Sequence, residues 1–154
     1  MPRLSEYVIQ QICLHAEREY PSEACGMIIG PQGKENAIGV FPIRNIQDEL
    51  HQKDPKTYTR DSRTAYFMDP KQMKIVEKEA AHKGFDLKVI YHSHPDHEVY
   101  FSDEDRLMAA PWGEPNLPGV VWVVISVKNG KAVAASEFEW SDEKKDYVES
   151  KLKV

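Results

Sequence analysis

Two histidines separated by one residue, His92 and His94, are followed after a short polar stretch by Asp105, and this set is typical of a metal site. In an extended chain, residues two apart point to the same face and lie about 6.6 Å apart along it. Both imidazoles can therefore reach one ion. Two neutral nitrogens and one carboxylate would leave the fourth position of a tetrahedral zinc open for water. Because bound zinc lowers the pKa of such a water, the pattern predicts a hydrolytic centre with about one zinc per chain.

A hydrolytic centre also needs a general base from another segment, and Glu23 is the candidate. It precedes an apolar run that begins at Ala24, so it can stand at the end of a buried strand without binding the metal itself. Ser102 is expected at the start of the helix that carries Asp105, where a hydroxyl can stabilise a developing oxyanion. Two simpler interpretations stay open: Glu23 as a solvated acid, and Ser102 with Asp105 as a capping box.

Further side chains near these motifs have roles that the sequence leaves open. His97 competes as a ligand, although its place in a loop after a proline favours a supporting or substrate contact. Cys25 lies in an apolar run, where a thiol is more often a small buried hydrophobe than a nucleophile. It makes no CxxC pair with Cys13. Tyr100 and Phe101 are candidates for the wall of a substrate groove.

Periodicity predicts the elements that position these groups in the first half of the chain. Apolar residues at three- and four-residue steps predict a helix over 4–20, stopped by the following proline. The apolar runs 24–29 and 37–43, separated by glycines and a proline, predict a hairpin. The polar stretch 47–63 has no period and predicts a long loop, a kind of segment that is often functional.

The centre of the chain leads directly into the histidines. Asp69 followed by Pro70 predicts the start of a second helix, which Gly84 would end. The apolar run 87–91 then predicts a buried strand that finishes at the histidine cluster, with Pro95 unable to continue a hydrogen-bonded ladder. The ligands are therefore expected at a strand end.

The last third predicts a hairpin and a terminal helix. Asn129-Gly130, between the apolar runs 120–127 and 132–140, is the strongest short-range hairpin signal. Ser141 would cap a final helix that extends to about residue 152. Taken together, the elements predict a mixed sheet with helices packed against it, in a single domain over residues 1–154.

Composition limits the function classes. The chain has 154 residues, of which 41% are hydrophobic, and a formal net charge of −5, with Lys and Arg scattered. One core is expected, and the basic patch of a nucleic-acid-binding protein is lacking. No apolar run reaches the roughly 20 residues that span a bilayer, and the first residues lack the apolar core of a signal peptide. We therefore expect a cytoplasmic protein without nucleic-acid or membrane partners, of open oligomeric state.

These motifs resemble the signature of the JAMM (MPN+, Mov34/PAD-1-like) metallopeptidases: a glutamate on an early strand, then His-x-His-Pro, then Ser-x-x-Asp. The sequence supplies Glu23, His92-Ser93-His94-Pro95 and Ser102-x-x-Asp105 in that order, and the segment 21–30 resembles that around the glutamate in compact prokaryotic members. The resemblance spans roughly residues 4–140. Phe101 departs from it, because the family usually has proline before the serine.

The resemblance implies a cytidine-deaminase-like, three-layer α/β/α fold with a mixed, largely antiparallel sheet. It also implies zinc-dependent hydrolysis of an amide or isopeptide bond, with His92, His94 and Asp105 as ligands, Glu23 as base and Ser102 stabilising the tetrahedral intermediate. Compact prokaryotic members act at the C-terminal Gly-Gly tails of ubiquitin-like or sulfur-carrier proteins, releasing a cysteine, a short extension or a conjugate.

Two other functions compete with this interpretation. The first is a non-catalytic MPN scaffold that only binds partners, although such modules usually lose a ligand. The second is a zinc deaminase, which the missing Pro-Cys-x-x-Cys motif argues against.

Overall fold

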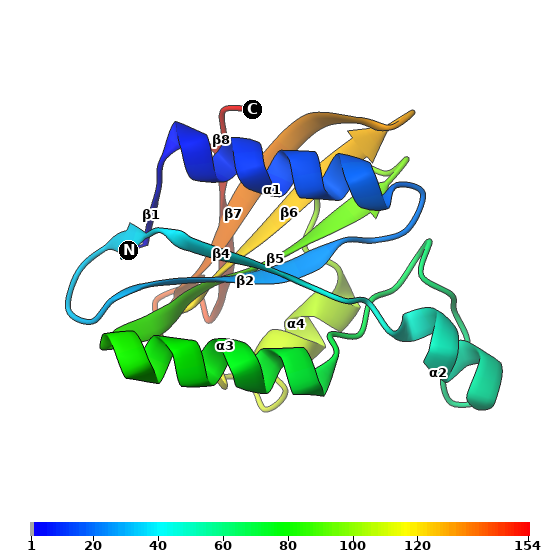
Figure 1. The fold of residues 1–154 in the computed structure, drawn as a ribbon, viewed down its shortest axis with the longest axis horizontal. Helices are drawn as coiled ribbons and strands as arrows, with labels where there is room; N and C mark the ends of the chain where they lie inside the picture. The colour runs from blue at the N-terminus through cyan, green and yellow to red at the C-terminus, as the bar shows by residue number, and fades with distance from the viewer. Residues whose placement is uncertain (1) are drawn as a thin grey trace.

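The computed structural model describes residues 2–154 and contains a six-stranded sheet with helices on both faces (Figure 1). The strand order is β4-β2-β5-β6-β7-β8, and β1 and β3 form a separate parallel pair. The strands are β1 (Arg3–Leu4), β2 (Cys25–Pro31), β3 (Asn36–Ala37), β4 (Gly39–Ile43), β5 (Phe85–Pro95), β6 (Val121–Lys128), β7 (Lys131–Ser141) and β8 (Asp146–Leu152). The helices are α1 (Glu6–Glu19), α2 (Gln47–Lys53), α3 (Pro70–Lys83) and α4 (Asp103–Ala109).

The sheet is mixed and largely antiparallel, as expected. Only the central β5–β6 pair is parallel within it; β2 pairs antiparallel with both β4 and β5, and β6, β7 and β8 follow as an antiparallel meander. Helix α1 covers one face, and α3 and α4 lie on the other (Figure 1). The predicted three-layer α/β/α arrangement is confirmed.

Alternation along β5 decides which way the histidines point. Val89 and Tyr91 belong to the core under α1, whereas Ile90 belongs to the core on the α3 side. Because side chains two apart share a face, His92 and His94 continue on the α3 side of the sheet. The period-two pattern thus extends from packing residues directly into candidate ligands.

The register between β2 and β5 places the candidate base beside the histidines. Cys25 pairs with His92, and the amide of Ser93 donates to the carbonyl of Ala24 at 3.0 Å, which continues the same register. One step further sets Glu23 opposite His94. This adjacency depends on a strand pairing between segments about seventy residues apart in the sequence.

Close packing of β2 on β5 requires glycine at position 26. A Cβ built on Gly26 would lie 2.4 Å from the ring of Tyr91, much closer than any carbon contact allows. The Tyr91 hydroxyl in turn lies 2.8 Å from Nδ1 of His15 on α1. The strand that carries the histidines is therefore locked to its neighbours on both sides.

Helix α3 begins and ends where the sequence predicts, whereas α1 begins at Glu6, two residues later than expected, because Leu4 belongs to β1. Ser5 caps α1 by accepting from the amide of Val8, and Asp69 caps α3 by accepting from the amide of Lys71. Gly84 ends α3 at a φ of 69°, in the left-handed region that glycine adopts without strain. None of the helices in residues 2–154 is both long and apolar enough to cross a bilayer.

The prediction of a terminal helix after Ser141 is wrong, because this segment forms strand β8. The Ser141 hydroxyl does accept from the amide of Lys144, as a cap would, but the chain turns at Lys145 with a φ of 53°. Tyr147 then pairs with Trp140 and buries its ring in the core. Pairing with β7 and burial of the Tyr147 ring stabilise a strand here, and they outweigh the local cap that would favour a helix.

Two other predictions need correction. The segment 47–63 is not entirely loop, because residues 47–53 form α2, a short helix that projects beyond the end of the sheet (Figure 1). It has no apolar face, so hydrophobic periodicity could not reveal it. The buried strand is also longer than the apolar run 87–91: β5 begins at Phe85 and continues through both histidines to Pro95, which ends it as predicted.

Candidate metal centre

Three buried side chains converge at the end of β5 and the start of α4. Nε2 of His92 lies 3.3 Å from Nε2 of His94 and 3.4 Å from Oδ2 of Asp105. All three candidate ligand atoms lie within 4.8 Å of one another, and they form the only such group of His, Cys, Asp and Glu found within residues 2–154. The structure therefore brings together the three residues that the sequence singles out as ligands.

The donor set fits a zinc ion. The Nδ1 of His94 lies 3.1 Å from the carbonyl oxygen of Glu98, to which it can donate its proton. That tautomer leaves a lone pair on Nε2, directed at His92 and Asp105. Two imidazole nitrogens at 3.3 Å have at most one hydrogen bond to share, whereas a cation between them would satisfy both. With the carboxylate, they provide the three protein ligands of a catalytic zinc site.

Helix α4 fixes the position of Asp105 through its own cap. The Ser102 hydroxyl accepts from the amide of Asp105 at 3.0 Å, and the Asp105 carboxylate accepts from the amide of Ser102 at 2.9 Å. This is the capping box that was one interpretation of the Ser-x-x-Asp motif. The cap orients the same carboxylate toward His92, so capping and ligation are compatible.

The protonation states of two members of the cluster, Asp105 and His94, suit metal binding. Burial raises the pKa of Asp105, but His92 and the hydrogen bonds from Ser102 have a larger, opposite effect and lower this pKa to about 2. Burial and the neighbouring His92 lower the pKa of His94 to about 4. Burial also opposes the charged form of His92, but Asp105 outweighs it and the pKa of His92 is raised. Asp105 is therefore an anion and His94 neutral near pH 7, the forms that bind metal.

Glu23 is a buried carboxyl at the same site, with 6% of its surface exposed. Burial raises its pKa from 4.5 to about 7, with His92 opposing that shift and Asp105 adding to it. Its backbone is held on both sides: Asn45 Nδ2 donates to the Glu23 carbonyl at 2.9 Å, and the Glu23 amide donates to the carbonyl of Ser62 at 2.7 Å. A carboxyl that exchanges its proton near neutral pH is suited to general acid and base chemistry.

An open cleft of about 730 Å³ gives access to this cluster. One wall comes from α4 and the loop before it, with Ser102, Asp105 and Tyr100, and the other from residues 57–66. Glu23 and His94 also line the cleft. The Tyr100 ring is 51% exposed and lies 4.8 Å from the ring of His94.

Phe101 does not line this groove, contrary to expectation. Only 4% of its surface is exposed, and its ring stacks on Phe138 at 5.1 Å and packs against Trp122 and Tyr147. The chain alternates direction here, so Tyr100 faces the cleft and its neighbour enters the core. Phe101 is therefore a core residue and not a substrate contact.

The two residues left open by the sequence occupy different places. His97 is exposed and lines the cleft, outside the cluster of candidate ligands. Cys25 is fully buried, and burial raises the pKa of its thiol far above the ordinary value, which does not suit a nucleophile.

Sequence reasoning missed Tyr66, whose ring stacks on that of His92 with centroids 4.6 Å apart and 25° between the planes. It also missed Asn45, which joins the backbones of Glu23 and Ala65. Neither Tyr66 nor Asn45 lies in a sequence motif that indicates a metal or catalytic site. Their roles arise from contacts between segments distant in sequence, so no local signal could have revealed them.

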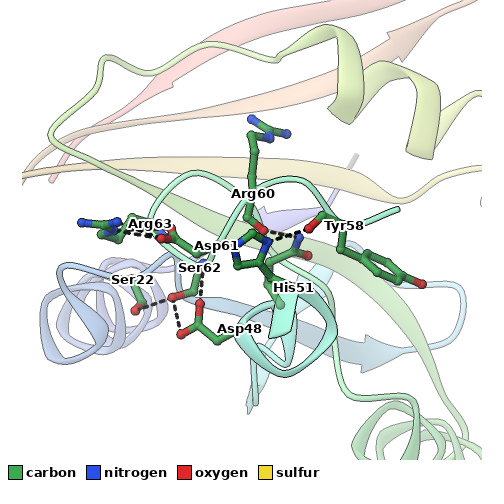
Figure 2. A network of polar contacts seen from close by, with 9 residues as sticks. Ser22, Asp48, His51, Tyr58, Arg60, Asp61, Ser62 and Arg63 are labelled. Carbon is green, nitrogen blue, oxygen red and sulfur yellow. Dashed lines mark hydrogen bonds and ion pairs between the residues drawn. The ribbon is translucent and has the colours of Figure 1, made fainter. Parts of the chain in front are cut away.

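A polar network shapes the loop that forms one wall of the cleft (Figure 2). Asp48 of α2 accepts hydrogen bonds from the amide and hydroxyl of Ser62, and the hydroxyls of Ser62 and Ser22 lie 2.8 Å apart. His51 Nδ1 lies 2.7 Å from the carbonyl oxygen of Tyr58. Helix α2 therefore acts as a support for the loop, which explains why this polar segment is ordered.

The α/β/α sandwich and a buried His-His-Asp cluster beside a carboxyl define a class of protein in which side chains from a strand end and a helix start could hold one metal ion. The chain belongs to the family of prokaryotic homologs of the JAB domain, whose model matches residues 5–141.

Two curated relatives carry specific names. The chain is 29% identical over 122 residues to the CysO-cysteine peptidase of Mycobacterium tuberculosis, covering 79% of this chain and 70% of the relative. It is 27% identical over 121 residues to the desampylase of Haloferax volcanii, covering 79% and 71%.

Solved structures support the fold. The solution structure of protein DSY2949 from Desulfitobacterium hafniense matches with a TM-score of 0.70 at 22% identity, covering 97% of this chain and 90% of the other. A solution structure from Salinibacter ruber matches with a TM-score of 0.62 at 22% identity, covering 95% and 86%. At this level of identity, the likeness concerns the fold alone.

Proposed function

We propose that this chain is a zinc-dependent peptidase that hydrolyses an amide bond at the C-terminal Gly-Gly tail of a ubiquitin-like or sulfur-carrier protein. The observation that carries this proposal is the position of a buried carboxyl, Glu23, in a cleft that is also lined by His94 and Asp105, two members of the convergent group of three candidate ligands. The names of the curated relatives, a peptidase of a cysteine conjugate and a desampylase, support the substrate class.

His92 and His94 would hold the zinc through Nε2, and Asp105 through a carboxylate oxygen. When bound, zinc supplies Lewis acidity and lowers the pKa of water. The two neutral imidazoles and one carboxylate leave part of the metal's positive charge uncompensated, which this chemistry requires. One zinc per chain is expected, because the described residues offer one cluster of this kind.

Glu23 takes a proton from the attacking water and delivers it to the nitrogen of the leaving amine as the amide bond breaks. A pKa of about 7 lets the same carboxyl act first as base and then as acid near neutral pH. Ser102, at the N-terminus of α4, contributes its hydroxyl and the partial positive charge of the helix end where negative charge develops on the substrate carbonyl oxygen.

The cleft suits an extended tail. Its walls are formed by α4 and by loops, and Tyr100 presents an exposed ring beside His94. Glycines have no side chains to clash with these walls, so a Gly-Gly segment can lie close to the metal ligands. A cytoplasmic location accords with two buried cysteines that form no disulfide.

The test combines metal content and hydrolysis. Purified wild-type protein, loaded with zinc, is incubated with a sulfur-carrier protein whose Gly-Gly tail is extended by one cysteine, and products are followed by mass spectrometry. We expect cleavage after the second glycine, and loss of this activity by about 10²-fold or more in Glu23→Gln with zinc retained. Zinc-loaded protein that binds the carrier without cutting it would favour the scaffold function instead.

A further inference from the structure

Arg60 occupies a singular position in the cleft. It is the only lysine or arginine among the residues that line it, whereas four acids, Glu23, Asp103, Glu104 and Asp105, line the same space. Its charge acts on Glu23 across the cleft, where it favours the ionised carboxylate. A single cation in an acidic cleft, close to the candidate base, is placed to bind an anionic group of a substrate.

The backbone of Arg60 is held in place on both sides. The buried Gln47 of α2 donates from Nε2 to the Arg60 carbonyl at 2.9 Å. Two residues on, Ser62 is fixed by Asp48 and accepts from the amide of Glu23. Figure 2 shows the Arg60 side chain extending away from this network. The loop is thus tied to the candidate base itself, which fixes the backbone of Arg60 relative to the site of hydrolysis.

The guanidinium has an exchangeable partner. It forms an ion pair with Glu104 in the first turn of α4, next to the candidate ligand Asp105, and both members of the pair are exposed. Exposed ion pairs of this kind contribute little to stability, because solvent screens them and both side chains lose freedom. A carboxylate arriving with a substrate can therefore replace Glu104 at little cost.

Arg63, three residues after Arg60, has a partner within its own loop and is directed elsewhere. Arg63 pairs with Asp61 of the same loop through its Nε and Nη2 atoms and does not line the cleft with Glu23. In Figure 2 it points to a different side of the network from Arg60. The loop therefore neutralises one arginine locally and directs the other into the cleft.

A carboxylate close to the scissile bond identifies one class of leaving group. When the amide nitrogen belongs to a C-terminal amino acid, a free carboxylate is attached to the adjacent carbon. When it belongs to a lysine side chain of a conjugated protein, no carboxylate is nearby. Arginine binds carboxylates through paired, charge-assisted hydrogen bonds, so it can distinguish these two substrates.

We propose that Arg60 is the specificity-determining residue that binds the free α-carboxylate of the leaving amino acid and directs the enzyme toward single-residue extensions of the tail. This inference rests on the proposed function. In the reaction, the hydroxyl of water joins the glycine carbonyl carbon, the C–N bond breaks, and the amine takes the proton. The carboxylate on Arg60 is unchanged, and its binding places the scissile nitrogen beside Glu23.

The experiment compares two substrates that differ in one group: a sulfur-carrier protein ending in Gly-Gly-Cys with a free carboxylate, and the same protein with a C-terminal carboxamide. We expect wild-type kcat/KM to be at least about tenfold higher for the acid. In Arg60→Gln, the ratio of the acid value to the amide value should fall to about one, mainly through KM for the acid, while the zinc content stays unchanged. The lost charge near Glu23 affects both substrates alike and does not alter this ratio. Arg63→Gln is the matched control and should retain the preference.

Glu104→Gln gives a second readout, because it frees the guanidinium and should lower KM for the acid alone. Equal wild-type rates on acid and amide would overturn the inference and leave the proposed function intact. An equal loss on both substrates in Arg60→Gln would also overturn it, since it would show a purely structural role. If zinc-loaded wild-type protein cuts neither substrate, the proposed function fails and the inference fails with it.

Discussion

The ring of Tyr66 stacks on the imidazole of His92, with their centroids 4.6 Å apart and their planes 25° from parallel. The Nδ1 atom of His92 is buried without a hydrogen-bond partner among residues 2–154, whereas the Nδ1 of His94 faces the Glu98 carbonyl. The two candidate ligands are therefore oriented differently, His94 by a hydrogen bond and His92 by packing against an aromatic face.

This difference makes Tyr66 a testable support of the metal site. Replacing Tyr66 with alanine removes the face that orients His92, and we expect zinc affinity to fall by about 10- to 100-fold, as for other groups that orient ligands. Tyr66→Phe keeps the ring and should bind zinc like the wild type. Competition with a chromogenic chelator measures both, and equal affinities in wild type and Tyr66→Ala would contradict the role.

The ligand assignment predicts which histidines matter for zinc. His92→Ala and His94→Ala should each lose most of the bound zinc, because each removes one of three protein ligands. His97→Ala should keep about one zinc per chain, since His97 lies outside the cluster. Elemental analysis of purified, dialysed proteins checks this, and stoichiometric zinc in His92→Ala would refute the assignment.

Glu23 should make the metal-free protein less stable as pH rises. Its pKa is 4.5 ordinarily and about 7 in the fold. Below about pH 4.5 the folded and unfolded chains both hold the proton; between pH 4.5 and 7 only the folded chain does, so the free energy of unfolding falls as pH increases. The full penalty, about 3 kcal/mol from the size of the shift, applies above pH 7.

Glu23→Gln has no such proton to lose. After zinc removal with EDTA, urea denaturation should show the variant more stable than wild type at pH 8 and nearly equal to it at pH 4.5. A stability difference that does not change between these pH values would rule out Glu23 as its source.

Ser102 has two roles that substitutions can separate. Ser102→Ala removes both the hydroxyl and the cap, so it should lose about 1 kcal/mol of stability and lower kcat by about 10- to 10³-fold. Ser102→Gly also removes the hydroxyl but costs only a few tenths of a kcal/mol as a cap. If kcat is lowered equally in both variants, the effect belongs to the hydroxyl. If kcat is normal in Ser102→Gly, the role of Ser102 is limited to capping.

Tyr100 and Phe101 are adjacent in sequence, but substitution of Phe101 should affect stability and substitution of Tyr100 should affect substrate binding. Phe101→Ala empties a core position and should cost about 3–5 kcal/mol of stability. Tyr100→Ala, at an exposed position, should change stability by less than about 0.5 kcal/mol while raising KM for the tail substrate. Thermal melts and steady-state kinetics on both variants check this, and a raised KM without destabilisation in Phe101→Ala would reverse our assignment.

Local signals recovered much of the fold because they act over a few residues. The caps at Asp69 and Gly84 bound α3 as expected, and Asn129-Gly130 forms the predicted hairpin turn with positive φ at both residues. The cap at Ser141 failed as a helix signal, since a serine hydroxyl closes a turn as readily as it starts a helix. Pairing with β7 then settled the conformation of that segment.

The sequence by itself determined the identity of the cluster. His-x-His along an extended strand and Ser-x-x-Asp at a helix start are local geometries, so His92, His94 and Asp105 could be named before any fold was known. Only the tertiary structure decided what surrounds them: the β2–β5 register that sets Glu23 opposite His94, the stacking of Tyr66, and the loop that directs Arg60 into the cleft. These relationships depend on contacts between segments far apart in the chain, which no local pattern encodes.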